Sequence, residues 1–156
     1  MERERVLFVC TYQGARARIA EEFIKRIAPG KIEAYSSCFE PRKITRLPID
    51  LMREVGITLS AESPKSVFER HKDGEVFDYV ITLCFDATTE LCPIFKTSID
   101  TMYAKKAEMI YWSIPDFKTL MGTEEEKKAE ARLIRDEIKS EVISFLKRIG
   151  IDAEIE

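Results

Sequence analysis

The sequence predicts an α/β fold, in which helices cover a parallel β-sheet. Short apolar runs alternate along the chain with segments where apolar residues recur every three or four positions. Strands that alternate with helices are typical of parallel sheets joined by right-handed crossovers. A length of 156 residues suits one domain with a substantial core. We therefore expect a single domain over residues 1–156.

Four apolar runs are the predicted strands. Residues 5–10 (RVLFVC) are apolar throughout after the arginine, as in a strand that is buried on both faces. The other three runs are residues 31–37, 77–84 and 107–114. The runs at 5–10 and 77–84 both end on a cysteine, which marks the ends of these strands as places for chemistry.

The predicted helices lie between and after these strands. A capping box of Thr123 and Glu126 opens the last helix, which carries an apolar stripe and ends at Gly150. Three earlier helices are predicted as well. Apolar residues at helical spacing, or a proline in the first turn of a helix and a glycine after its last turn, indicate them. They cover residues 16–28, 47–56 and 63–71.

Composition excludes several classes of function. The net charge is −3, from 25 basic and 28 acidic residues, so we expect no nucleic-acid partner. No apolar stretch suits a signal peptide or a membrane span, so we expect a cytoplasmic protein with reduced thiols and no membrane partner. His71 is the single histidine, which excludes Ser-His-Asp and Cys-His catalysis. The cysteine spacing is unlike that of zinc motifs, so we expect neither a metal nor another cofactor.

Three chemically active residues follow the ends of predicted strands. Cys10 ends the first strand, Cys84 ends the third, and Asp116 comes just after the fourth. The carboxyl ends of parallel strands share one rim, which is where ligands bind in open α/β sheets. We expect these side chains to converge there.

The loop after the first strand has the pattern Cys-x5-Arg, from Cys10 to Arg16. Amides in such a loop, the start of a helix and a planar guanidinium together stabilise a thiolate and hold an oxyanion beside it. The alternative is that Cys10 merely packs as a small hydrophobe, but the strand before it and the helix after it favour a nucleophile. The expected oxyanion-binding residues are Thr11, Tyr12, Gln13, Gly14, Ala15 and Arg16.

This loop is similar to the active-site loop of low-molecular-weight protein tyrosine phosphatases and of the thioredoxin-coupled arsenate reductases that share their fold. The resemblance covers nearly the whole chain. It implies a three-layer fold with a four-stranded parallel sheet and helices on both faces. It rests on the segments VLFVCTYQGARARIAEEF, YSSCFEP, LMREVGITLSAESPKSV, YVITLCFDATTELCPIF and YWSIPDF.

The cysteine pair Cys84 and Cys92 favours the arsenate reductase branch. In that branch the resemblance implies a relay of three thiols: Cys10 attacks arsenate, Cys84 attacks Cys10, and Cys92 attacks Cys84. The relay would leave a Cys84–Cys92 disulfide exposed for thioredoxin, the expected electron donor. The alternative is that Cys84 is a buried residue at a strand end and Cys92 is incidental.

A protein tyrosine phosphatase is the second hypothesis. It needs only Cys10, Arg16 and a general acid, for which Asp116 matches the aspartate of the family. Asp116 as a plain turn residue is the alternative. Phe117 and Tyr12 would grip an aromatic phosphate ester, which is the substrate that this hypothesis implies in place of arsenate.

Two departures from the family pattern support a third hypothesis, an oxyanion or redox sensor without turnover. Gln13 stands where relatives have asparagine, and Ala17 stands where they have a serine that helps to hold the thiolate. The loss of that hydroxyl predicts a less acidic Cys10. Cys38 replaces a common glycine, and the sequence suggests only a packing role for it.

Overall fold

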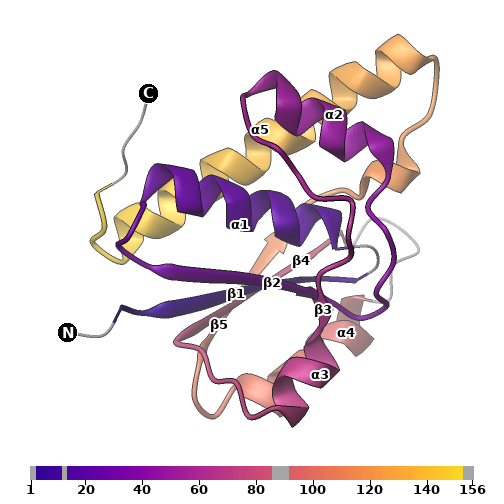
Figure 1. Cartoon of the computed structure of the whole chain (residues 1–156). Helices are drawn as coiled ribbons and strands as arrows, with labels where there is room; N and C mark the ends of the chain where they lie inside the picture. Colours follow the sequence, from indigo (N-terminus) through magenta and orange to yellow (C-terminus); the bar gives the residue numbers. More distant parts are fainter. Residues whose placement is uncertain (1–2, 12–13, 86–91, 153–156) are drawn as a thin grey trace.

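The computed structural model describes residues 3–11, 14–85 and 92–152. Strands and helices alternate through these residues (Figure 1). The strands are β1 (Arg5–Cys10), β2 (Glu33–Cys38), β3 (Lys65–Ser66), β4 (Tyr79–Cys84) and β5 (Glu108–Ser113). The helices are α1 (Ala15–Ile27), α2 (Arg46–Glu54), α3 (Val67–Lys72), α4 (Cys92–Tyr103), a 3-10 turn η1 (Phe117–Thr119) and α5 (Glu124–Arg148).

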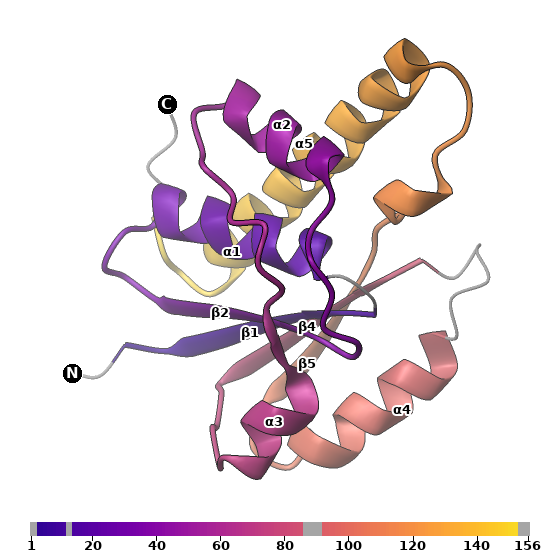
Figure 2. The same ribbon diagram turned by 45° about the vertical axis from the view of Figure 1, so that its right-hand side comes forward.

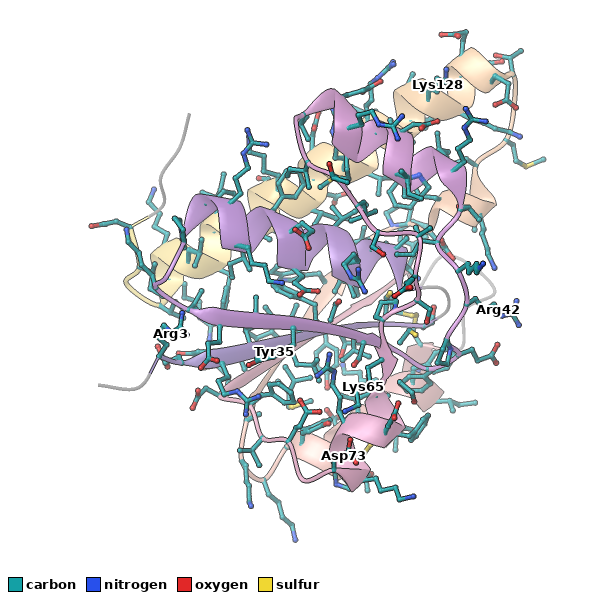
Figure 3. The ribbon with its side chains drawn as sticks, viewed as in Figure 1. Arg3, Tyr35, Arg42, Lys65, Asp73 and Lys128 are labelled. Atoms are coloured by element: carbon teal, nitrogen blue, oxygen red, sulfur yellow. A yellow bond between two sulfur atoms is a disulfide. The ribbon has the colours of Figure 1, made fainter. Side chains whose placement is uncertain are left out.

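The strands form one parallel sheet in the order β3-β2-β1-β4-β5. The expected α/β class is confirmed, but the expected number of four strands is wrong: the described residues form five. The additional strand, β3, has two residues and pairs with the end of β2. Lys65 in β3 holds it against the end of α3 by donating to Asp73 at 2.7 Å and to Glu75 at 3.1 Å (Figure 3).

Helices cover both faces of the sheet. Helices α1, α2 and α5 lie on one face, and α3 and α4 lie on the other (Figures 1 and 2). Each face has its own apolar core. Strand β1 contributes to both cores, because alternate side chains of a strand point to opposite faces. Phe8 and Cys10 lie in the core on the α1 side, and Leu7 and Val9 lie in the core on the α4 side. None of the described helices has the length and hydrophobicity needed to cross a membrane.

The strand order reverses next to β1. From β1 the chain goes through α1 to β2 on one side, whereas β4 lies on the other side and continues through α4 to β5. The crevice at such a reversal, beyond the carboxyl ends of the strands, is where open α/β sheets bind ligands. β1 ends at Cys10 and β4 at Cys84, so both cysteines border this crevice.

Two elements differ from the sequence prediction. The segment predicted as one helix over 63–71 is divided into β3 and α3, and the helix α4 was not predicted at all. Pro93 occupies the first turn of α4, and Ile99 and Tyr103, four positions apart, are buried in the core on that face. The capping box of Thr123 and Glu126 at the start of α5 is present as predicted.

Candidate functional site

Cys10 lies at the buried end of the central strand. It is 2% exposed and is in register with Cys38 on β2 and Leu83 on β4. Its side chain belongs to the core on the α1 side of the sheet. The backbone amide of Ala17, in the first turn of α1, forms a hydrogen bond with the Cys10 sulfur, so the start of this helix lies next to the thiol.

The Arg16 guanidinium is fixed beneath the loop by contacts with two other segments. It is 2% exposed, and it donates from Nη1 to the carbonyl of Ile114 at 2.7 Å and from Nη2 to Oγ1 of Thr11 at 3.1 Å. Nη2 also lies 3.9 Å from Oδ2 of Asp116. The structure therefore brings Arg16 and Asp116 together, and the guanidinium is held in place before any ligand arrives.

Gly14 closes the loop tightly. Its φ of 85° is in the left-handed region, and a Cβ at this position would lie 2.5 Å from Cγ of Pro64. Its carbonyl accepts from the amide of Arg18 at 2.8 Å, in the first turn of α1. Of the predicted oxyanion-binding residues, Tyr12 and Gln13 lie outside the described residues. Thr11 and Gly14 are buried before α1, and Ala15 and Arg16 are buried in its first turn.

The protonation state of Cys10 differs from the sequence expectation. Burial raises the pKa of its thiol to about 12, although the charge of Arg16 and a backbone hydrogen bond from Ala17 act to lower it. Cys38 and Asp116 add smaller contributions that raise the pKa further. Burial of Cys10 therefore opposes the expected thiolate, whereas Arg16 and the amide of Ala17 favour it.

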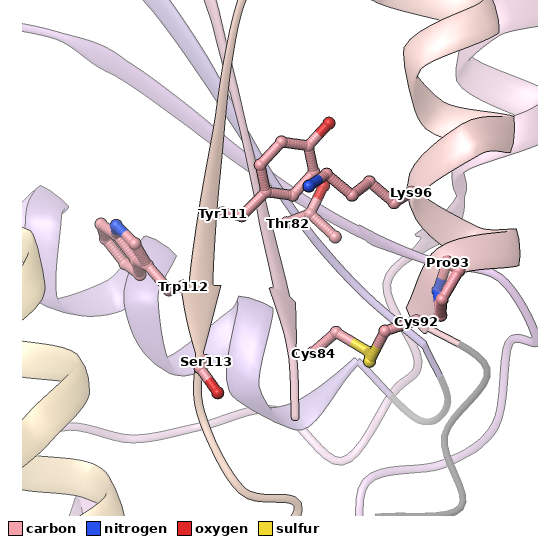
Figure 4. Close-up of a pocket in the computed structure, with 8 residues that line it drawn as sticks. All are labelled: Thr82, Cys84, Cys92, Pro93, Lys96, Tyr111, Trp112 and Ser113. Atoms are coloured by element: carbon pink, nitrogen blue, oxygen red, sulfur yellow. A yellow bond between two sulfur atoms is a disulfide. The ribbon is translucent and has the colours of Figure 1, made fainter. Parts of the chain in front are cut away.

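Cys84 and Cys92 form a disulfide between the end of β4 and the first residue of α4, with their Cα atoms 6.0 Å apart (Figure 4). The expectation that this disulfide is exposed is wrong, because Cys84 is 9% and Cys92 6% exposed. Leu83 belongs to the core on the α1 side, so Cys84 points to the α4 side. Cys10 and the disulfide thus lie on opposite faces of the sheet.

Asp116 is 9% exposed, and its carboxylate accepts from the amide of Lys118 at 3.3 Å, at the start of η1. Phe117 is buried in the apolar core, so the expectation that its ring grips a substrate is wrong. Trp112 is a core residue as expected, with its ring centroid 5.7 Å from that of Phe8. Over the described ranges, no group of three or more His, Cys, Asp or Glu residues is placed to hold a metal ion.

Sequence reasoning missed a pocket of about 360 Å³ beside the disulfide. It lies between the sheet and α4, and its walls include both halves of the disulfide (Figure 4). Two signals in the sequence point to it: Thr82 is two positions before Cys84 and faces the same way, and Lys96 lies one helical turn after Cys92. The first follows from the predicted strand, whereas the second is visible only once α4 is known to be a helix.

Comparison with known proteins gives one consistent family. Residues 5–154 match the family model "low molecular weight phosphotyrosine protein phosphatase". A protein of Bacillus subtilis named arsenate reductase is 30% identical over 148 residues, which are 93% of this chain and 96% of that protein.

Two solved structures resemble the fold. An arsenate reductase in its oxidised state superposes with a TM-score of 0.73 at 23% identity, over 94% of this chain and 99% of the other. A low molecular weight protein tyrosine phosphatase of T. tengcongensis gives a TM-score of 0.69 at 19% identity, over 93% and 99%. At these identities the likeness concerns the fold alone.

Proposed function

Because this chain belongs to the low molecular weight phosphotyrosine protein phosphatase family, we propose that it is an arsenate reductase that acts as a single cytoplasmic domain through a relay of three thiols. Cys10 is the nucleophile, Arg16 and the loop from Thr11 to Ala15 bind the oxyanion, and Asp116 transfers protons. Cys84 and Cys92 carry the electrons. Similarity to the curated B. subtilis arsenate reductase supports this choice.

The disulfide between Cys84 and Cys92 is the observation that carries the proposal. Phosphoester hydrolysis needs a nucleophile, a bound oxyanion and a general acid, and it leaves no role for two further thiols. Reduction of arsenate to arsenite needs two electrons, which one disulfide supplies when it forms. Cys84 ends β4 and Cys92 begins the next helix, so both lie at the edge of the sheet where β1 ends with Cys10.

In the first step the Cys10 sulfur bonds to the arsenic of dihydrogen arsenate. Cys10 enters as a neutral thiol, and its proton joins the departing arsenate hydroxyl, which leaves as water. Asp116 passes this proton; its proximity to Arg16, at 3.9 Å between Oδ2 and Nη2, supports this role. Arg16 holds the remaining oxygens, since its planar fork suits a tetrahedral oxyanion.

In the second step Cys84 attacks the Cys10 sulfur, the sulfur–arsenic bond breaks, and arsenite leaves with the electron pair and the Cys84 proton. Cys92 then attacks Cys84, which releases Cys10 as a thiol and leaves the disulfide described above. The second step needs Cys84 on the same face as Cys10. It follows that the end of β4 and the start of α4 rearrange when the disulfide is reduced.

The test couples arsenate reduction to thioredoxin, thioredoxin reductase and NADPH. We expect NADPH loss that depends on arsenate and is abolished by Cys10→Ser, Cys84→Ser and Cys92→Ser separately. Thioredoxin is the proposed electron donor because the relay ends on a dithiol pair. An arsenate-independent rate would contradict the proposal.

A tyrosine phosphatase is the second candidate, because Cys10, Arg16 and Asp116 alone suffice for hydrolysis of a phosphate ester. An aryl phosphate separates the two. Hydrolysis that survives Cys84→Ser and Cys92→Ser, without arsenate turnover, would assign the phosphatase. Oxyanion binding with neither turnover would assign a sensor.

A further inference from the structure

The pocket beside the disulfide has the features of a ligand site that is separate from the loop containing Cys10. It lies on the α4 face of the sheet, between β4, β5 and the start of α4 (Figure 4). Its volume of about 360 Å³ is at the lower end of the range for small-molecule sites. Pro93, Lys96 and Ser113 are exposed, so the pocket opens to solvent. It therefore has room for a molecule with one ring and an attached polar group.

One wall of the pocket carries a buried polar group without a partner. Thr82 is 2% exposed, and its Oγ1 has no hydrogen-bond partner among the residues that the structure describes. Thr82 is in register with Tyr111 on β5, and both line the pocket. An unpaired buried hydroxyl costs free energy, so a ligand that accepts a hydrogen bond from Thr82 removes this cost.

The electrostatic environment of the pocket favours an anion. Among the described residues that line it, Lys96 carries the only charge, and its Nζ lies 4.0 Å from the centroid of the Tyr111 ring. The nearby Asp100 accepts a hydrogen bond from the Tyr111 hydroxyl. The pocket also adjoins the first residues of α4, which has no acidic side chain in its first turn, and a helix start carries a partial positive charge. One ammonium and one hydroxyl donor together match the two oxygens of a carboxylate.

The remaining walls favour an aromatic body for this ligand. They include the Pro93 ring and the two sulfurs of the disulfide, and sulfur makes favourable contacts with aromatic rings. We propose that this pocket binds a small aromatic carboxylate. Its carboxylate pairs with Lys96 and accepts a hydrogen bond from Thr82, and its ring lies against the disulfide.

Binding at this pocket is linked to the redox state of the protein. The disulfide forms part of the wall, and it joins the start of α4 to the end of β4 with the two Cα atoms 6.0 Å apart. Reduction removes this link, so the ligand binds the oxidised protein in preference and slows its reduction. The ligand thus regulates the regeneration step by competing with the electron donor. This link to regeneration rests on the proposed function, in which the disulfide is reduced in every turnover.

Calorimetric titration of the oxidised full-length protein, without arsenate, tests the site. Benzoate is the probe, and benzamide and benzylamine are its neutral and cationic counterparts. We expect saturable binding of benzoate and much weaker binding of the other two. Lys96→Met should weaken the binding of benzoate by about tenfold, because a hydrogen bond between charged groups is lost. Thr82→Val should weaken it by about fivefold, while the urea midpoint stays at or above that of the parent, because this hydroxyl has no partner to lose.

Lys139→Met, at an exposed position on α5, is the matched control and should leave the affinity for benzoate unchanged. Absence of saturable binding would overturn the proposal, as would equal affinities for benzoate and benzamide, or equal effects of Lys96→Met and Lys139→Met.

The rate of disulfide reduction tests the redox link. The oxidised protein is treated with dithiothreitol, quenched by alkylation and analysed by mass spectrometry. Benzoate at about ten times its Kd should slow the reduction by about tenfold, in proportion to the fraction of protein that is occupied. A rate that does not depend on bound benzoate would overturn the link. Neither measurement uses arsenate or thioredoxin, so a failure of the proposed function leaves both outcomes distinct.

Discussion

At the scale of single residues, burial decides the chemistry of Cys10. A positive guanidinium and a backbone amide both favour the thiolate, yet removal from water outweighs them and raises the pKa of the thiol to about 12. In the proposed mechanism Cys10 therefore carries its own proton into the reaction with arsenate. This proton is the one that the leaving oxygen needs, so a high pKa is compatible with arsenate as substrate.

Alkylation of Cys10 in the oxidised protein tests this protonation state. Only the thiolate reacts, so the rate with iodoacetamide should rise about tenfold for each pH unit between about 7 and 10. The chain unfolded in urea is the control, and there the rate should level off above about pH 9. A rate in the folded protein that is already constant near pH 7 would show that Cys10 is ionised.

The sequence predicts candidate site residues but not the environment in which their side chains lie. Cys10, Arg16 and Asp116 are found from strand ends and spacing, because those follow from the order of residues. The raised pKa of Cys10, the burial of Phe117 and the location of the sulfurs on opposite faces depend on packing and on which face each side chain occupies. Nothing in the local sequence carries that information.

At the scale of elements, the turn before α1 requires glycine at position 14 because of its backbone conformation and because of a close neighbour. Gly30, which follows α1, shares only the first of these features and serves as a comparison. Gly14 and Gly30 both have positive φ, at 85° and 74°, and alanine at either position would cost about 1–2 kcal/mol for the backbone alone. At Gly14 the added Cβ also overlaps Pro64, whereas at Gly30 it meets nothing within 4 Å.

Gly14→Ala is therefore predicted to destabilise the protein by at least about 1 kcal/mol more than Gly30→Ala, as overpacking does. Urea unfolding of the two variants and the parent measures the difference. Gly14→Ala should also weaken oxyanion binding, which Gly30→Ala should leave intact. Equal losses of stability would contradict the account of this turn.

Helices α2 and α5 are joined by ion pairs to Glu54. Arg132 donates to both carboxylate oxygens at 3.0 and 2.9 Å, Arg135 donates to one at 2.9 Å, and these hydrogen bonds lower the pKa of Glu54 to about 2. A lowered pKa in the folded state contributes stability above the ordinary pKa of about 4.5. That contribution is lost as the pH falls from there to about 2.

Glu54→Gln should accordingly lower Tm at pH 7, and the difference from the parent should shrink as the pH falls from about 4.5 to 2. Thermal unfolding followed by circular dichroism across this range makes the comparison. Glu137→Gln, an exposed carboxylate on α5, serves as the control and should shift Tm little at any pH. A difference in Tm between parent and Glu54→Gln that stays constant with pH would show that the ionised carboxylate of Glu54 is not the source of the stabilisation.

Prediction from sequence also differs between elements. Strands β1, β4 and β5 contain consecutive apolar residues, and each of the four six-residue strands, β2 included, overlaps a segment that the sequence predicts as a strand. Strand β3 has two residues and no periodicity of its own, and it exists because Lys65 and Ser66 meet the end of β2. Helix α4 has no acidic residue in its first turn to signal a helix start in the sequence. Its buried residues Ile99 and Tyr103 pack in the core on this face of the sheet.

At the scale of the whole molecule, the sheet separates the two halves of the proposed chemistry. The oxyanion loop and Cys10 belong to the α1 side, and the disulfide and its pocket belong to the α4 side. Both halves meet at the rim where the strand order reverses. The proposed relay connects them only if Cys84 reaches the α1 side at this rim once the disulfide is reduced.

A single turnover by Cys92→Ser tests this connection most directly. The reduced variant is mixed with one equivalent of arsenate, quenched with an alkylating agent, digested and mapped by mass spectrometry. We expect one equivalent of arsenite and a pair of peptides joined by a Cys10–Cys84 disulfide, because the third thiol that would resolve this disulfide is missing. Arsenite release with both cysteines alkylated, or no arsenite at all, would contradict it.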